Sequence, residues 1–170
     1  MVISTLHTND APSAIQRLVN LGISTGDISS AINAIMAQRL VRKLCPDCKK
    51  EYKPDARQQK EIKDILSSLP KNIKTPDLSK IKLFKPAPEG CDKCNKLGYF
   101  GQVALYEIMI KDENLQAIFA KSASTLEIKK AAAAGGMITL RQDGLLKALD
   151  GLTSIEEVER VTGELGKAEI

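Results

Sequence analysis

The first 44 residues alternate between short apolar groups and polar breaks, and these breaks mark the ends of the predicted elements. The apolar, β-branched run Val2–Leu6 predicts a buried strand. No turn or cap precedes it, so we expect a chain cut from a longer one, with Met1 as an artificial start. A helix is predicted next from Asp10, because Pro12 suits its first turn and Gly22 its end.

A second helix is predicted from about Asp27 to Lys43, where apolar residues recur every three or four positions. Its basic last turns suit the negative end of the helix dipole. The positions that set the spacing are Ile28, Ile32, Ile35, Met36 and Leu40.

The middle of the chain carries a weaker pattern. A short apolar stripe predicts a helix over residues 61–69, and four prolines between residues 70 and 88 predict extended or irregular chain. Residues 102–109 are rich in β-forming side chains.

Helical spacing returns in the last third of the chain, where we expect a small helical bundle. Ser124 with Glu127, and Ser154 with Glu157, match the capping-box pattern that opens a helix. The predicted helices cover residues 113–121, 125–134, 140–150 and 155–162.

The four cysteines form two Cys-x-x-Cys pairs, Cys45 with Cys48 and Cys91 with Cys94, separated by 42 residues. Each pair can present two thiolates on one tight turn, and two such turns can enclose a zinc ion. A dithiol/disulfide centre is the alternative, but it needs one reactive pair beside a βαβ pattern. We predict a structural zinc site, since four thiolates leave no open position for water.

Composition and charge narrow the functional classes. Only 4% of the residues are aromatic, and no apolar run is long enough to cross a bilayer. Residues 39–96 carry 16 Lys/Arg against 8 Asp/Glu, although the whole chain has a net charge of +4. This excess predicts an acidic protein, anionic lipid or nucleic-acid partner, or a solvated lysine-rich loop. The scarcity of aromatics argues against single-stranded nucleic acid.

No catalytic motif is complete. The chain contains no P-loop, no G-x-G-x-x-G and no His-Glu-x-x-His. Its only histidine, His7, follows the predicted opening strand, and the carboxyl ends of strands are where ligands bind in open α/β sheets. The alternative is an ordinary packed or surface histidine.

Several segments together resemble the ATPases that power type II secretion and type IV pilus assembly. Ser4–Ala11 is similar to their histidine box, Ala37–Cys45 to the approach to their four-cysteine zinc module, and Gly90–Glu107 to its exit. The segments Thr139–Gly144 and Gly151–Val158 are similar to their C-terminal helices.

The resemblance implies an α/β remnant of a RecA-like ATPase core, mostly helical, with an inserted four-cysteine zinc module and a C-terminal helical bundle. Residues 1–44 would end the core, 45–101 would form the zinc module with its basic insert, and 102–170 would hold a return strand and the helical subdomain. The family's P-loop, acidic boxes and arginine fingers precede the histidine box. This isolated chain is therefore not expected to hydrolyse ATP.

By position in the family, His7 would lie near the nucleotide γ-phosphate, with Thr5 supporting the same pocket. The four cysteines would hold zinc, while ATP and magnesium would bind only to the full-length protein. The implied partners are the rest of the ATPase, neighbouring subunits of a homohexamer, and an inner-membrane platform or adaptor protein. The implied location is cytoplasmic, peripheral to the bacterial inner membrane, with only indirect contact with the membrane surface. Nucleic acid is not an expected partner.

Two features depart from the family pattern. Phe100 and Gln102 stand where relatives usually carry basic residues, and the segment between the cysteine pairs is longer than in many relatives. Retraction-type pilus motors lack the cysteines, so the resemblance favours assembly or secretion.

A free-standing zinc-dependent module that binds protein or nucleic acid is the alternative function, supported by the basic segment. In a third interpretation the chain is a domain in which zinc only replaces a hydrophobic core as a source of stability. Because the insert has few large apolar residues, Cys91→Ser is expected to unfold the zinc module and leave most tail helices intact.

Overall fold

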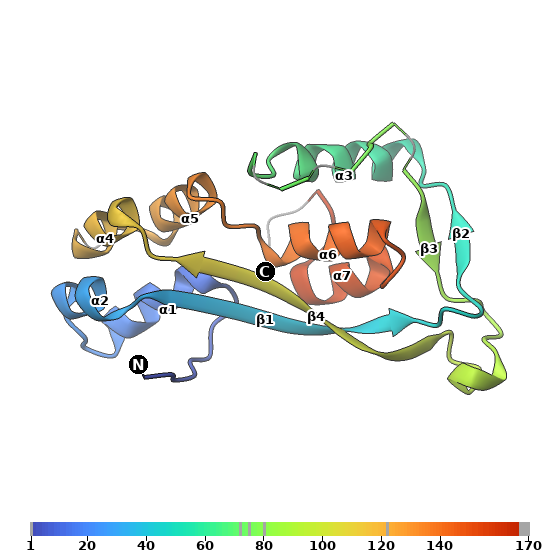
Figure 1. Ribbon diagram of the computed structural model, residues 1–170, viewed down its shortest axis with the longest axis horizontal. Coiled ribbons are helices and arrows are strands. Elements are labelled where there is room, and N and C mark those ends of the chain that lie inside the picture. The colour runs from blue at the N-terminus through green and yellow to red at the C-terminus, as the bar shows by residue number, and fades with distance from the viewer. Residues whose placement is uncertain (1, 72, 75, 80, 122, 167–170) are drawn as a thin grey trace. The chain divides into compact units, whose positions relative to one another are not determined.

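The computed structural model describes residues 2–71, 73–74, 76–79, 81–121 and 123–166. The chain divides into two compact units, the first formed by Met1–Ala37 with Tyr106–Thr139 and the second by Gln38–Leu105 with Leu140–Ile170. The elements, labelled in Figure 1, are α1 (Ala11–Asn20), α2 (Thr25–Ala31), β1 (Ala34–Leu44), β2 (Lys50–Tyr52), α3 (Ala56–Ser67), β3 (Leu83–Lys85), the 3-10 helix η1 (Asp92–Cys94), β4 (Tyr99–Ile110), α4 (Glu113–Ala120), α5 (Thr125–Ala134), α6 (Leu140–Leu149) and α7 (Ile155–Thr162).

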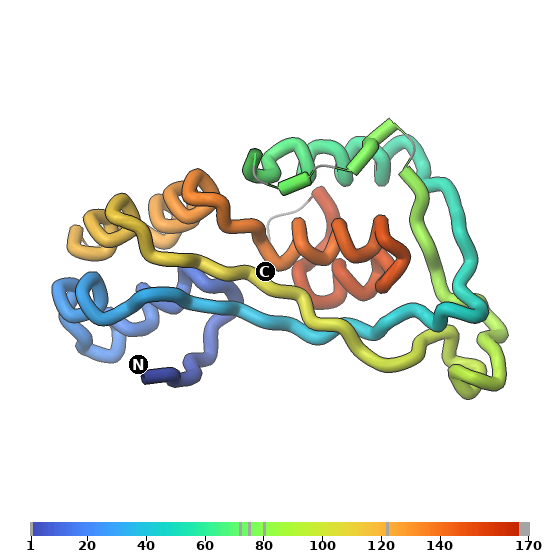
Figure 2. Tube along the Cα trace, viewed as in Figure 1, coloured from blue at the N-terminus to red at the C-terminus, as the bar shows by residue number. Residues whose placement is uncertain are grey.

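Two strand pairs are present among the described residues. β1 pairs with β4, and Figure 2 traces the chain out along β1 and back along β4 next to it. β2 pairs with β3 in antiparallel register, with Lys50 opposite Lys85 and Tyr52 opposite Leu83. The β-rich segment predicted at residues 102–109 is confirmed as part of the longer β4.

The first unit packs α1, α2, α4 and α5 around an aliphatic core. The predicted first helix is confirmed as α1, since the Asp10 side chain accepts a hydrogen bond from the Ser13 N–H and Pro12 lies in the first turn. Gly22 follows its end with φ +87°, a conformation that favours glycine. The buried core residues are Ala11, Ile15, Ile28, Met109, Leu115, Phe119, Ile128, Ala131, Ala132 and Met137.

The prediction of a buried opening strand is wrong. Val2 and Ile3 are 92% and 83% exposed, and residues 2–8 form no regular element. A strand needs a neighbour for its backbone hydrogen bonds, and no strand in the described part of the chain pairs with Val2–Leu6.

The predicted helix from Asp27 to Lys43 is also wrong beyond its first third. α2 ends at Ala31, Ile32 has an extended backbone, and the chain continues as β1. Pairing with β4 favours the strand, in which Ile35 packs on the first core while the next residue, Met36, is 60% exposed. The apolar spacing fits a helix equally well, because short apolar runs satisfy both periods.

The second unit joins the segment between the cysteine pairs to the last two helices. α6 lies beside α7 and packs against α3, as Figure 1 shows. The helix predicted at 61–69 is confirmed over residues 61–67 as part of α3, which starts earlier and opens with a capping box of Asp55 and Gln58. The buried core residues are Ile62, Leu66, Ile81, Leu83, Leu145, Ala148, Ile155, Val158 and Leu165.

The start of α6 connects three elements of this unit. The Arg141 guanidinium donates to the Thr162 carbonyl at the end of α7, and the Gln142 amide donates to the Ser68 hydroxyl after α3 at 2.9 Å. Gly144 leaves room for α7, since a Cβ there would lie 2.7 Å from a methyl group of that helix. Three residues of the Thr139–Gly144 segment, Arg141, Gln142 and Gly144, therefore each have a structural role in this unit.

The four helices predicted in the last third are confirmed as α4 to α7, and they are divided between the two units. α4 and α5 belong to the first unit and α6 and α7 to the second, and the predicted boundary between residues 101 and 102 lies within β4. The Ser124–Glu127 capping box is confirmed. The second predicted box is wrong, because the Ser154 hydroxyl pairs with the Tyr99 hydroxyl at 3.0 Å and makes no cap.

Glu157, the residue assigned to that second capping box, instead links α7 to β1. Its side chain is 1% exposed and accepts the Arg42 backbone N–H at 2.8 Å, the Arg42 guanidinium at 2.7 Å and the Arg160 guanidinium at 2.9 Å. Burial raises the pKa of this carboxyl, but the hydrogen bonds from Arg160 and Arg42 outweigh it and lower the pKa to about 2.

This low pKa predicts a pH-dependent stability. The Glu157 carboxylate should stabilise the fold fully above its ordinary pKa of 4.5, and this contribution should disappear as the pH falls toward 2. Denaturant unfolding of the wild type and Glu157→Gln should differ by on the order of 2 kcal/mol at pH 7, and the difference should shrink below pH ~4.5. Glu156→Gln, at an exposed neighbour on α7, should follow the wild type. If the difference in unfolding free energy between the wild type and Glu157→Gln did not depend on pH, the negative charge of Glu157 would not be the stabilising feature.

Candidate metal centre

The four cysteine sulfurs converge on one point of the second unit. All four Sγ atoms lie within 4.8 Å of one another. The Sγ–Sγ distance is 3.7 Å for Cys45 and Cys91, 3.8 Å for Cys48 and Cys94, and 3.7 Å for Cys91 and Cys94. Four sulfurs bound tetrahedrally to zinc at 2.3 Å would lie about 3.8 Å apart. The cluster can therefore hold one tetrahedral metal ion without rearrangement of these pairs.

The end of β1 delivers the first cysteine pair. The Leu44 N–H donates to the Leu152 carbonyl at 2.9 Å, and the Cys45 N–H donates to the Gly98 carbonyl at 3.0 Å. The Lys49 N–H then donates back to the Cys45 carbonyl at 3.0 Å and closes the turn. The first cysteine turn is thereby fixed to both the second turn and the loop between α6 and α7.

In the second cysteine pair, Cys91 directly precedes η1 and Cys94 is its last residue, and backbone N–H groups on both sides of η1 donate to the Cys94 sulfur. The N–H groups of Cys91 and Gly98 each lie 3.2 Å from the Cys94 Sγ. A Cβ on Gly90 would come within 2.3 Å of the Lys96 backbone, so the tight turn requires glycine there. Gly98 was not predicted as part of the site, although it stands four positions after the last cysteine.

These contacts make the thiols of the cluster unequal. Burial raises the pKa of the Cys94 thiol, but the N–H groups of Cys91 and Gly98 outweigh burial and lower it to about 6. Burial, followed by hydrogen bonding with Cys45, raises the pKa of the Cys48 thiol to about 12. A bound cation would favour the thiolate form of each ligand.

The alternative interpretation of the cysteines, a dithiol/disulfide centre, requires one reactive pair. Instead, each sulfur of one pair lies next to a sulfur of the other, and all four cysteines are free thiols. Such a donor set favours metal binding, and a four-thiolate shell suits a structural ion.

His7 and Thr5, the predicted nucleotide-proximal residues, belong to the first unit, whereas the cysteines belong to the second. Both residues are exposed in the segment before α1. Just beyond His7, the Thr8 hydroxyl donates to the Asp10 carbonyl at 3.0 Å, so local bonding holds the end of this segment.

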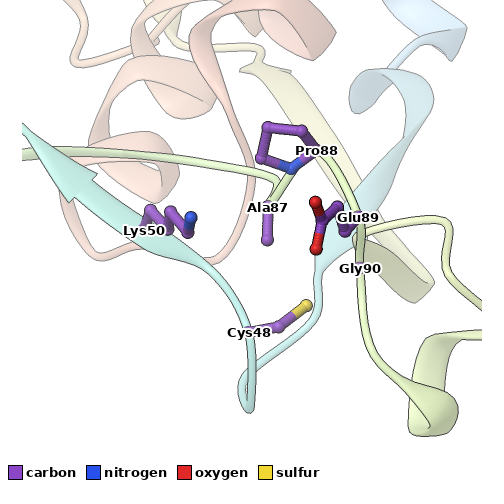
Figure 3. Close-up of a pocket in the computed structure, with 6 residues that line it drawn as sticks. All are labelled: Cys48, Lys50, Ala87, Pro88, Glu89 and Gly90. Carbon is purple, nitrogen blue, oxygen red and sulfur yellow. The ribbon is translucent and has the colours of Figure 1, made fainter.

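A hollow of about 370 Å³ lies beside the cluster, and Figure 3 shows the residues that gather around it. It combines an ammonium group from Lys50 and a carboxyl group from Glu89, neither of which was singled out from the sequence. Its full lining is Cys48, Lys50, Ala87, Pro88, Glu89 and Gly90.

Comparison with known proteins shows the class to which the chain belongs. Residues 1–160 match the family described as "Type II/IV secretion system protein", and the chain is a member of that family.

Among curated relatives, the chain is 39% identical over 158 residues to the type IV pilus assembly ATPase PilB of Thermus thermophilus, which covers 93% of the chain and 16% of that protein. It is 40% identical over 162 residues to PilB of Pseudomonas aeruginosa, covering 95% of the chain and 26% of that protein. It is 39% identical over 164 residues to the type II secretion system ATPase E of Vibrio cholerae, covering 96% of the chain and 30% of that protein. The chain thus spans less than a third of the length of these relatives.

None of the helices in the described ranges has the length and apolar character that a bilayer crossing requires.

The cluster geometry predicts one zinc ion per chain. In protein purified without chelator, elemental analysis should find a zinc-to-chain ratio near one, and thiol titration should detect few reactive thiols until a chelator releases the metal. Chains without zinc, whose thiols are already oxidised or freely reactive, would contradict a metal site and support redox chemistry.

The contacts of the first cysteine turn change the expected effect of Cys91→Ser. The Lys49 ammonium donates to the Gly151 carbonyl at 2.8 Å, and the Leu44 N–H donates to the Leu152 carbonyl, so the first cysteine turn is bonded to the loop between α6 and α7. Hydrogen exchange should therefore rise in α3, α6 and α7, while α1, α4 and α5 keep their protection.

Ser67→Ala, on the exposed side of α3, serves as the control for this experiment. Equal loss of protection in both units, or protection kept in α6 and α7, would contradict the coupling.

Proposed function

We propose that this chain is the C-terminal portion, from the histidine box onward, of a hexameric motor ATPase that powers type IV pilus assembly or type II protein secretion. The observation that carries the proposal is the family match over residues 1–160. The convergence of four thiols within 4.8 Å of one another also supports it, because the cysteine spacing and the family resemblance both predicted a four-cysteine site.

Nucleotide binding requires the rest of the protein. The chain has no P-loop, and relatives named as ATPases are more than three times as long. ATP and magnesium therefore belong to the assembled full-length protein. In that assembly, the imidazole of His7 and the hydroxyl of Thr5 act as donors toward the γ-phosphate, and their exposure leaves them accessible for this contact.

Zinc in this proposal is structural. The ion, bound by Cys45, Cys48, Cys91 and Cys94, supplies cross-linking and no reaction chemistry, since four thiolates fill its shell. The chain's own part is to present two turns at the ends of β1 and β4 and to donate amide hydrogens to the Cys94 sulfur.

The partners proposed for the motor are neighbouring subunits of a homohexamer and an inner-membrane platform or adaptor protein, with the motor on the cytoplasmic side. The charge of residues 39–96, 16 basic against 8 acidic, suits an acidic protein surface.

The same basic charge supports the alternative of a free-standing zinc-dependent binding module. Affinity for nucleic acid that falls steeply with salt would favour that alternative.

The proposal predicts that the isolated chain hydrolyses no ATP and that His7→Ala in the full-length protein lowers kcat about tenfold or more. Steady-state phosphate release measures both. Asn20→Ala, at the exposed end of α1, should retain the parental rate. Turnover by the isolated chain would contradict the fragment assignment, and an unchanged kcat for His7→Ala would contradict its nucleotide-proximal role.

A further inference from the structure

Glu107 places a carboxylate in an apolar row of β4. Along Leu105–Ile110 the side chains alternate between buried and exposed, and Glu107 occupies the buried position between Leu105 and Met109. It is 1% exposed. Burying a carboxylate is costly unless hydrogen-bond donors face it, so its partner indicates why the acid is tolerated.

One partner of Glu107 is the start of α1. The Glu107 Oε1 accepts the backbone N–H of Ala11 at 2.8 Å, across 96 positions of sequence. Ala11 is fully buried and is the first residue of the helix, where negative charge suits the helix dipole. Pro12 has no N–H, and the Ser13 N–H bonds to Asp10 at 2.8 Å. The amides at these first three helical positions are thus either absent or bonded to a carboxylate.

The turn that leads into α1, residues Thr8–Asp10, begins directly after His7. The Thr8–Asp10 and Asp10–Ser13 hydrogen bonds are local and shape the turn itself. The bond from Ala11 to Glu107 ties that turn to a distant strand. Glu107 therefore helps to fix the position of the turn on the first core, and the His7 segment extends from that turn.

We propose that Glu107 is a positioning residue for His7, acting through Ala11 and the turn at Thr8–Asp10. This inference rests on the proposed nucleotide-proximal role of His7. Glu107 itself contacts no nucleotide in this account. Its effect on turnover arises because a displacement of about 1 Å in a reacting group can cost about 100-fold in rate.

The test uses the full-length protein with Glu107→Leu, which removes the acceptor, and Glu107→Gln, which keeps an oxygen and the side-chain volume. The matched control is Glu127→Gln, because the Glu127 carboxylate also accepts a backbone N–H at 2.8 Å beside the N-terminus of a helix in the same unit. Hydrogen exchange over residues 5–16 should increase in both Glu107 variants, more strongly in Glu107→Leu, and stay unchanged in the control. Unchanged exchange in both Glu107 variants would overturn the proposal.

Turnover supplies the second measurement. Glu107→Leu should lower kcat about tenfold while KM for ATP changes less than about twofold, and it should add little further loss in a His7→Ala background. Full additivity of the two losses, or a normal kcat for Glu107→Leu where His7→Ala is slow, would overturn the positioning role. If His7→Ala alone is silent, the nucleotide-proximal role of His7 fails, and the exchange measurement decides by itself whether Glu107 holds the segment.

Discussion

The convergence of four thiols is the constraint on which the second unit depends. Sulfurs 3.7–3.8 Å apart suit a shared cation, and without one the thiolates would repel one another. Holding them together joins the end of β1 to the start of β4 and encloses the segment that contributes Ile62, Leu66, Ile81 and Leu83 to the second core. The loop between α6 and α7 bonds to the first cysteine turn, so the constraint extends to those helices.

Two buried glutamates make further long-range connections. Glu107 and Glu157 are each 1% exposed, and each accepts a backbone N–H at 2.8 Å from a segment about a hundred positions earlier. Glu157 also accepts hydrogen bonds from the Arg42 and Arg160 guanidinium groups, and Glu107 accepts the backbone N–H of the first residue of α1. Each glutamate side chain thus fixes one backbone position, Ala11 in the first unit and Arg42 in the second, by a directional hydrogen bond that apolar packing does not provide.

The two units hold different parts of the proposed function. The four-cysteine cluster lies in the second unit, and the exposed segment with His7, for which we propose a nucleotide-proximal role, lies in the first. The chain belongs to the type II/IV secretion family but spans less than a third of the relatives it matches, so the proposed phosphate binding is assigned to the remaining protein.

The sequence by itself determined the local features. Proline, glycine and capping residues marked the helices from residue 113 onward, and the spacing of the cysteines indicated one shared site, because these signals act over a few residues. Only the tertiary structure decided that residues 34–44 form a strand, since pairing with β4 overrides an ambiguous apolar spacing. It also separated α4 and α5 from α6 and α7, and it gave Glu107 and Glu157 their partners. Contacts across a hundred positions leave no periodic trace in a single chain.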